Sequence, residues 1–244
     1  MKQKEIFLSI IIPAYNEEFR IRKTLIDINE YLSKQKYNYE IIVVNDGSKD
    51  KTVEIVKALG SQILNLKLID NKENKGKGFV VKQGMLLAKG QYRLFADADN
   101  STSIKEVEKM WPYFKQEYDI IIGSRDIQGS VITTPQSWLR KLLGNIFNLI
   151  VQIVCGLWGI WDTQCGFKGF SEKAVKDIFP KLTINRWAFD AEVLVLGKKE
   201  GYKIKEVPIR WANDLGSKVT LGGMIKMLFE VFKIRLNLIK RTYD

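Results

Sequence analysis

The sequence predicts an α/β fold in which a mostly parallel sheet is flanked by helices. Three observations lead to this prediction. Short apolar runs rich in β-branched residues alternate with longer helical segments through the first half of the chain. The connections between them are short, as expected of right-handed crossovers between parallel strands. Polar, acidic and glycine residues follow each apolar run, at the edge where such sheets bind ligands.

The predicted elements of the first half follow one another in alternation. The strands span Leu8–Ile12, Glu40–Asn45, Leu66–Asp70, Tyr92–Ala96 and Asp119–Ile122. The helices span Glu17–Lys34, Lys51–Leu59, Gly78–Ala88 and Ile104–Gln116. Together they predict one continuous α/β unit.

The second half is less regular. Its predicted elements are a long apolar helical region over Gln136–Trp161, a loop with a short strand over Asp162–Phe170, a helix over Trp187–Lys199, a strand over Lys203–Trp211 and a basic amphipathic helix over Thr220–Arg241. We expect one domain over residues 1–219, which includes an interfacial helical region at about 136–161, followed by a C-terminal helix over 220–244.

The composition narrows the possible functions. The chain has 244 residues and a formal net charge of +11, which suits a nucleic acid, an anionic membrane or a phosphorylated substrate as partner. It has no histidine, which excludes Ser-His-Asp and Cys-His catalysis and His-ligated zinc. The two cysteines, Cys155 and Cys165, do not indicate a disulfide framework, so we expect a reducing compartment.

Two helical segments suggest contact with a membrane. Leu142–Trp161 is long enough to span a bilayer, but Asn145, Asn148 and Gln152 recur on one helix face, which favours a helix lying in the interface. The last helix separates a polar stripe from an apolar one, formed respectively by Lys226, Glu230, Lys233, Asn237 and Lys240 and by Leu228, Phe229, Phe232, Leu236 and Ile239. Such a helix suits an anionic leaflet; packing on its own domain or on a second subunit is the alternative.

The pattern Asp97-Ala98-Asp99 follows a predicted buried strand. Two carboxylates so close together repel each other unless a cation lies beside them. Carboxylates completed by diphosphate oxygens suit Mg²⁺ or Mn²⁺, and such an ion neutralises charge on a departing nucleoside diphosphate. An Asp-x-Asp triplet alone is more often a turn, so its position after a strand is what favours a metal site.

Two further motifs follow strands and have both a structural and a functional interpretation. Asp46-Gly47-Ser48 is typical of a tight turn before a helix, and it also suits a carboxylate that contacts a nucleotide base or ribose. Gly76-Lys77-Gly78 suits a loop whose backbone approaches a phosphate, with Lys77 supplying positive charge. It lacks the spacing of a Walker A motif.

The order of these motifs carries a resemblance. Pro13–Glu17, Asp46–Ser48, Gly76–Gly78, Asp97–Asp99 and Gly123–Arg125 occur in the order seen in glycosyltransferase family 2, whose members have the Rossmann-like GT-A fold. With Asp162–Lys168, Arg186–Asp190 and Gly216–Lys218, the chain most resembles the dolichyl-phosphate β-glucosyltransferases, with the dolichyl-phosphate mannose synthases next. The likeness covers roughly residues 7 to 220.

The resemblance implies a role for each matching residue. In the family, the nucleotide sugar is held by residues matching Pro13, Ala14, Tyr15, Glu17, Asp46, Gly76, Lys77, Asp97 and Ala98. The metal is held by residues matching Asp97 and Asp99, and the acceptor phosphate by residues matching Arg125, Arg140 and Lys218. Two departures, Ser101 where mannose synthases often have glutamine and Lys218 where they often have arginine, favour the glucosyl type.

The acceptor class agrees with the absence of histidine. A sugar hydroxyl must lose a proton to a general base, whereas a phosphate monoester is largely dianionic at neutral pH and needs none. Attack opposite the leaving diphosphate would invert the anomeric centre and give a β-linked product from an α-linked sugar. Asp190 and Glu192 are the nearest candidates for a base, and we keep Asp190 as a site residue beside its alternative as an acid at a helix N-terminus.

We therefore expect a metal-dependent inverting transferase that moves glucose from UDP-glucose to dolichyl or polyprenyl phosphate, peripherally bound to a membrane with its site on the cytoplasmic side. Mannose transfer from GDP-mannose and transfer to a sugar hydroxyl remain alternatives. A basic nucleic-acid-binding protein is the alternative from another class, but the basic and aromatic residues form no recognised nucleic-acid motif, so we expect no nucleic-acid partner.

Overall fold

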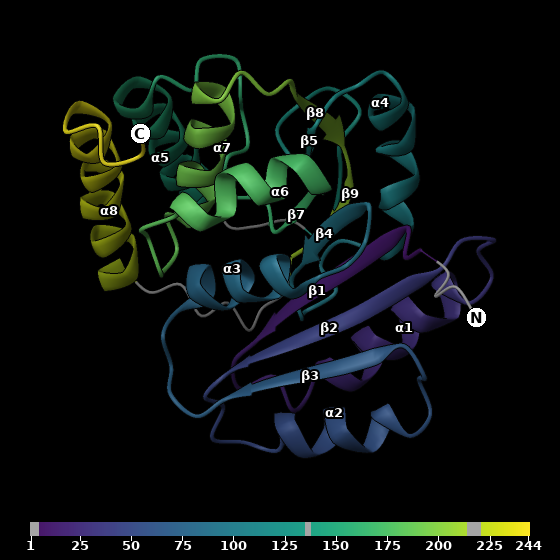
Figure 1. The fold of residues 1–244 in the computed structure, drawn as a ribbon. Helices are drawn as coiled ribbons and strands as arrows, with labels where there is room; N and C mark the ends of the chain where they lie inside the picture. The colour runs from purple at the N-terminus through teal and green to yellow at the C-terminus, as the bar shows by residue number, and fades with distance from the viewer. Residues whose placement is uncertain (1–4, 135–137, 214–220) are drawn as a thin grey trace.

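The computed structural model describes residues 5–134, 138–213 and 221–244, without the side chains of residues 139, 140 and 221. The fold is mixed α/β, with a central, mostly parallel sheet flanked by helices, as predicted (Figure 1). The sheet has seven strands in the order β3-β2-β1-β4-β7-β5-β8. Their bounds are β1 Leu8–Ala14, β2 Tyr39–Asp46, β3 Leu66–Asn71, β4 Tyr92–Ala96, β5 Ile120–Ser124, β7 Phe167–Ser171 and β8 Ile204–Pro208.

Strand β7 differs from its prediction. The sequence indicates only a short strand within a loop, but β7 lies in the middle of the sheet and pairs antiparallel with both β4 and β5. The remaining neighbours pair in parallel. Because β7 runs against its neighbours, its first residue, Phe167, pairs with the last residue of β4, Ala96. The loop that precedes β7 therefore enters the edge of the sheet where the other strands end.

Helices cover both faces of the sheet (Figure 1). One face carries α1 Ile21–Leu32, α2 Thr52–Gly60, the 3-10 helix η1 Ile104–Lys109 and α4 Trp111–Lys115. The other carries α3 Lys77–Leu87, α6 Glu172–Ile178, the 3-10 helix η2 Phe179–Lys181 and α7 Phe189–Lys199. Each face of the sheet has its own hydrophobic core, and alternate residues of β1 point to opposite faces. Ile11 packs in one core, and Ile10 and Ile12 pack in the other.

In the first half of the chain, two helices are shorter than expected, for local reasons, and the region expected to be helical over 136–161 forms a helix only from Trp138 to Cys155. Before α1, Asn16 has a φ of +52°, and the backbone N–H of Glu17 donates to Thr52 Oγ1, so the chain turns there and α1 begins at Ile21. The helix expected over 104–116 breaks at Met110 into η1 and α4. Pro112 lies in the first turn of α4, where its missing N–H does no harm. In the middle of a continuous helix the same proline would remove a hydrogen bond and clash with the preceding turn.

The strand expected over 203–211 is two strands in different sheets. β8 ends at Pro208, which has no N–H to continue the ladder. The chain then forms β9, Arg210–Ala212, which pairs in parallel with β6, Val131–Thr134. This small second sheet lies beyond the carboxyl ends of β5 and β8.

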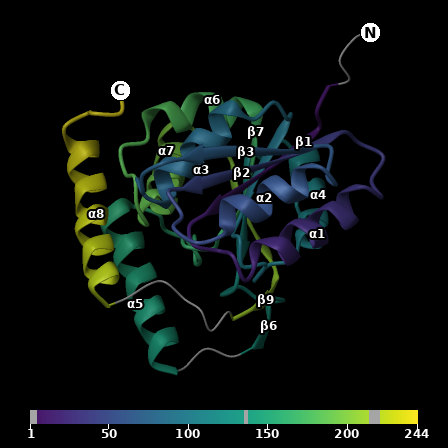
Figure 2. The same cartoon turned by 90° about the horizontal axis from the view of Figure 1, so that it is seen from below.

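Helices α5, Trp138–Cys155, and α8, Leu221–Ile239, lie side by side at one end of the molecule (Figure 2). Val231 and Ile234 of α8 are buried in the core that also contains α7. The predicted polar stripe of α8 does not simply face solvent: Glu230 accepts from the backbone N–H of Ala188, and Asn237 donates to Thr183 Oγ1. Among the described residues, no helix is both long and apolar enough to cross a membrane.

Candidate active site

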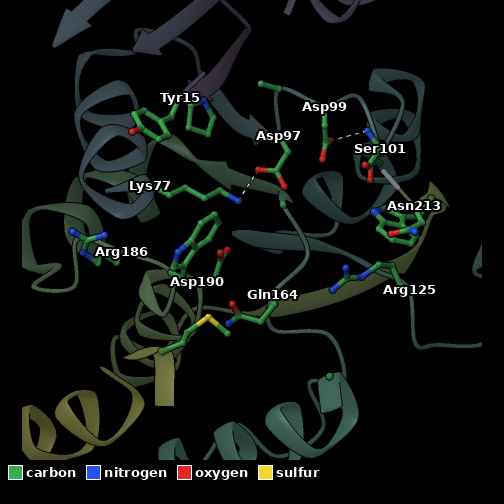
Figure 3. Close-up of a pocket in the computed structure, with 18 of the residues that line it drawn as sticks. Tyr15, Lys77, Asp97, Asp99, Ser101, Arg125, Gln164, Arg186, Asp190 and Asn213 are labelled. Carbon is green, nitrogen blue, oxygen red and sulfur yellow. Dashed lines mark hydrogen bonds and ion pairs between the residues drawn. The ribbon is translucent and has the colours of Figure 1, made fainter. Parts of the chain in front are cut away.

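One cavity of about 980 Å³ opens where strands β1, β2, β4 and β5 end. Its walls include all nine predicted nucleotide-sugar residues, which are Pro13, Ala14, Tyr15, Glu17, Asp46, Gly76, Lys77, Asp97 and Ala98. Asp99, Arg125 and Asp190 also line it. On the far side α5 contributes Asn145 and Asn148, and α8 contributes Met224 and Met227. The structure thus brings the predicted acids, Lys77 and Arg125 into one space, beside helices α5 and α8 (Figure 3).

The carboxylates of Asp97 and Asp99 follow β4 directly. Asp97 Oδ1 pairs with Lys77 Nζ at 2.6 Å, and Asp99 Oδ1 accepts from the backbone N–H of Ser101 at 2.9 Å. Gly166 makes room for Asp97, because a Cβ at Gly166 would lie 1.8 Å from Asp97 Oδ2. Burial, and then the nearby charge of Asp97, raise the pKa of Asp99. Added positive charge would relieve this repulsion, so the pair fits a divalent cation.

Such an ion would need oxygen ligands from outside the protein. In the part of the chain that the structure describes, no group of three or more histidine, cysteine, aspartate or glutamate side chains is arranged to hold a metal. Two carboxylates suit Mg²⁺ or Mn²⁺ when phosphate oxygens and water complete the shell. The donor set therefore fits an ion that binds together with a diphosphate.

Lys77 stands between two acids. It is the first residue of α3, its Nζ contacts Asp97, and Asp190 lies near enough to act on its charge. Burial opposes the charge of Lys77, yet Asp97 and Asp190 together hold its pKa above the ordinary value. Figure 3 shows the Lys77 side chain directed toward Asp97, with Asp190 on the opposite side.

Asp190 has a partner that the sequence did not reveal. Its carboxylate forms an ion pair with Nζ of Lys168, a fully buried lysine of β7 that also donates to the carbonyl of Cys165 at 2.5 Å. Burial raises the pKa of Asp190, although the Lys168 and Lys77 ammonium groups oppose that effect. A lysine between two phenylalanines of an apolar strand, Phe167 and Phe170, was the available signal, because a buried lysine needs a partner.

The carboxylate of Asp46 holds the loop that precedes α3. It accepts from the backbone N–H of Lys75 at 2.7 Å and from that of Gly76 at 3.0 Å. Burial raises the pKa of Asp46. Gly47, with a φ of +71°, forms the expected turn after β2, while the predicted contact of Asp46 with a base or ribose stays a prediction.

Arg125 follows β5, and its guanidinium is already engaged. Nε and Nη2 contact the two carboxylate oxygens of Asp162 at 2.7 and 2.8 Å, and Asp162 is fully buried. The guanidinium also lies 5.3 Å from the ring centroid of Trp211. The sequence alone does not reveal Asp162 as this partner. Its position just after a long apolar helical region was an available signal, since an acid in such surroundings needs a cation.

The positions of the other two predicted phosphate-binding side chains, Arg140 and Lys218, are not described. Lys218 and the side chain of Arg140 lie outside the described residues. Lys141, the neighbour of Arg140 on α5, does line the cavity.

The cavity also has walls that the sequence analysis did not assign. Arg186 and Trp187 line it from the loop before α7. Gln164 Nε2 and Asn213 Oδ1 are buried there without a hydrogen-bond partner in the structure as described. A buried polar atom without a partner costs free energy, so both suggest contacts that a ligand would complete.

Comparisons with known proteins identify the family of this chain. The model for "Glycosyl transferase family 2" matches residues 9–179. The dolichyl-phosphate β-glucosyltransferase of Dictyostelium discoideum is 39% identical over 243 residues, covering 94% of this chain and 74% of the relative. That of Saccharomyces cerevisiae is 36% identical over 253 residues, covering 96% of this chain and 75% of the relative.

Solved structures resemble the fold. Glucosyl-3-phosphoglycerate synthase from Mycobacterium tuberculosis, in a complex with Mn²⁺, UDP and glucosyl-3-phosphoglycerate, matches with a TM-score of 0.68 at 15% identity, covering 95% of this chain and 79% of that chain. Mannosyl-3-phosphoglycerate synthase from Rubrobacter xylanophilus matches with a TM-score of 0.72 at 13% identity, covering 97% and 75%. With the GT-A-like sheet and the matching family model, the chain belongs to glycosyltransferase family 2 and is a glycosyltransferase.

Proposed function

We propose that this enzyme transfers glucose from UDP-glucose to dolichyl phosphate or a related polyprenyl phosphate, with inversion at the anomeric carbon. The observation that carries the proposal is one cavity lined on one side by residues at the strand ends and on the other by two helices. Asp97 and Asp99 follow β4, Arg125 follows β5 and Lys77 begins α3, while α5 and α8 line the far side. A nucleotide diphosphate and a lipid-borne phosphate both find suitable groups in that space.

The strand-end wall suits the nucleotide sugar. Asp97 and Asp99 would hold Mg²⁺ or Mn²⁺, and the bound ion would supply positive charge against the leaving diphosphate. Lys77 adds a fixed ammonium group beside Asp97, and the loop anchored by Asp46 presents the backbone of Gly76. Tyr15 at the end of β1 offers a ring surface to the nucleotide.

The state of Asp190 supports a phosphate acceptor over a sugar hydroxyl. A general base must be free to accept a proton from the attacking group. The Asp190 carboxylate instead pairs with a buried lysine, Lys168. A phosphate dianion attacks without a base and needs only cations that offset its repulsion from the diphosphate. Arg125 is one of the described cations that line the cavity, and we propose that it acts with Arg140 and Lys218.

Helices α5 and α8 support binding at a membrane surface. Trp138, Leu149 and Ile153 of α5 and Phe229 and Ile239 of α8 are exposed large apolar side chains. Since both helices also line the cavity, an acceptor anchored in a bilayer would have its phosphate close to the site. We propose a peripheral enzyme with residues 1–219 as catalytic domain and 220–244 as membrane-facing helix. The two free, buried cysteines suit a site on the cytoplasmic side.

The direct test is transfer of label to lipid. Purified protein is incubated with Mg²⁺ or Mn²⁺, dolichyl phosphate and, separately, labelled UDP-glucose and GDP-mannose. We expect label from UDP-glucose in the organic phase, and its loss with EDTA or in Asp99→Ala. Label from GDP-mannose alone would assign the enzyme to mannose transfer. No lipid-linked label from either sugar would contradict the proposal.

A further inference from the structure

The loop between α5 and β7 is held at almost every residue. The backbone N–H groups of Trp161 and Asp162 donate to Glu206 at 2.9 and 3.0 Å. Thr163 Oγ1 donates to Asn148 Oδ1 at 2.9 Å, with both groups buried. The loop is therefore fixed on one side by β8 and on the other by α5.

The end of the same loop is tied to the acidic site. The carbonyl of Cys165 accepts from Lys168 Nζ, and that of Gly166 accepts from the backbone N–H of Asp97 at 3.1 Å. These contacts tie the loop to the lysine that pairs with Asp190 and to Asp97 itself. Residues on both sides of Gln164 are thus placed by contacts with strands that build the site.

Gln164 is the exception within this loop. Its side-chain nitrogen Nε2 is buried, and no described group accepts a hydrogen bond from it. The side chain lines the cavity, and Figure 3 shows it between Asp190 and Arg125. A buried N–H without a partner is unfavourable by itself, so a fixed loop that presents one suits an acceptor atom that arrives with a ligand.

Asn213 Oδ1 is the other unpartnered cavity atom, but the residues after it lie outside the description. All residues of the loop that holds Gln164 are described, so its neighbours in that loop are known. Gln164 also lines the same cavity as the groups proposed for the nucleotide sugar and as Arg125, which is proposed for the acceptor phosphate. The reacting ends of the two substrates would meet in this cavity.

We propose that Gln164 is a substrate-positioning residue whose Nε2 donates a hydrogen bond to an oxygen at the reacting end of the bound substrates. That oxygen belongs either to a hydroxyl of the transferred sugar or to the acceptor phosphate. This inference rests on the proposed function for the identity of the substrates. It adds a contact that neither the Asp97–Asp99 pair nor Arg125 provides.

The decisive variant is Gln164→Met, which keeps the length of the side chain and removes the amide. We expect kcat/KM for transfer to fall about threefold to tenfold if the lost partner is neutral, and about tenfold to hundredfold if it is charged. The thermal unfolding midpoint without substrates should stay unchanged or rise, because the unpartnered amide is gone. Gln62→Met, at an exposed site, is the matched control and should change neither quantity.

Two measurements separate the possible partners. If the partner is a sugar hydroxyl, Gln164→Met weakens binding of UDP-glucose but not of UDP, as measured by calorimetry. If it is the acceptor phosphate, both affinities stay the same and the KM for dolichyl phosphate rises. Gln164→Glu should be worse than Gln164→Met in the second case, because a carboxylate repels the phosphate.

The inference and the proposed function fail in different ways. Wild-type protein that transfers no glucose to lipid contradicts the proposed function, and unchanged binding of UDP-glucose by Gln164→Met then also overturns the inference. Wild-type protein that is active, with Gln164→Met within twofold of it in kcat and both KM values, overturns the inference alone. A lower unfolding midpoint with unchanged kinetics would assign Gln164 a structural role instead.

Discussion

At the scale of single residues, Gly76 is required for two separate reasons. Its φ is +104°, in the region that residues with a Cβ rarely adopt. A Cβ at Gly76 would also lie 2.4 Å from the carbonyl oxygen of Asn185. The backbone strain of a non-glycine residue and the steric clash therefore add at this position.

Gly201 separates the two effects, because its φ is +79° and a Cβ there would meet nothing within 4 Å. We expect Gly201→Ala to lower the free energy of unfolding by about 1–2 kcal/mol, from strain alone. Gly76→Ala should cost a further amount of about 1–3 kcal/mol from the clash, and it should weaken UDP binding because the loop moves. Urea denaturation and calorimetry test both points. Equal destabilisation by the two variants would contradict the steric argument.

The pair Arg125–Asp162 makes stability depend on pH. Burial opposes the charge of Asp162, but the Arg125 guanidinium holds the pKa of this carboxyl below its ordinary value. A carboxyl with a lowered folded-state pKa stabilises the fold above its unfolded pKa of about 3.9, and the contribution disappears as the pH falls through the folded-state pKa.

We therefore expect Asp162→Asn to be less stable than wild type at pH 7 by about 3–5 kcal/mol, because it leaves a buried guanidinium without its carboxylate. The difference should shrink as the pH falls below about 4. Urea unfolding of both proteins between pH 7 and pH 3 measures this. A difference that stays constant over that range would show that the ion pair is not its cause.

The sequence revealed the residues of the site better than their partners. Asp46 and Asp97 lie at the ends of β2 and β4, as expected, because a parallel sheet brings those ends together, and Lys77 reaches them from the start of α3. Lys168 and Asp162 were missed because a partner in space is set by tertiary packing, which one sequence does not show. Gln164 lies within the Asp162–Lys168 motif, which gives it no role, and only the burial of its amide draws attention to it.

At the scale of elements, the helices α5 and α8 present apolar side chains to the outside. Phe229 of α8 is 70% exposed, and Leu64, in the turn before β3, is 94% exposed. Both are large apolar residues, but only Phe229 belongs to the face proposed to enter a bilayer. The two positions therefore make a matched pair for testing that face.

We expect Phe229→Asp to weaken binding to vesicles that contain anionic lipid by about tenfold or more, since a buried phenyl group contributes about 1.5–3 kcal/mol. Leu64→Asp should bind as wild type does. Sedimentation with vesicles, at constant salt, measures both. Equal binding by all three proteins would move the membrane contact away from α8.

Most elements were predictable, and the errors have identifiable causes. The first five strands were found because buried parallel strands are short continuous apolar runs. Strand β7 was underestimated because its sequence, Phe167 to Ser171, contains a lysine and a glycine and so lacks that pattern. The apolar stripe of α8 was found, but the contacts of Glu230 and Asn237 with the domain depend on the loop before α7 and carry no periodic signal.

At the scale of the whole molecule, binding of the nucleotide should stabilise the fold. A ligand that binds only the folded state adds about 2.7 kcal/mol at a concentration of one hundred times its dissociation constant. We expect UDP with Mg²⁺ to raise the thermal unfolding midpoint of the wild type. In Asp99→Asn the part of the shift that needs Mg²⁺ should vanish while the effect of UDP alone stays. A full Mg²⁺-dependent shift in the variant would place the ion elsewhere.

The central position of β7 has a consequence for synthesis of the chain. Strands β4 and β5 leave the ribosome well before residues 167–171, which fill the gap between them. Until then β4 has an open edge, and such edges are sites of aggregation. A nascent chain that ends before Phe167 should therefore be insoluble, whereas one that includes β7 can close this gap.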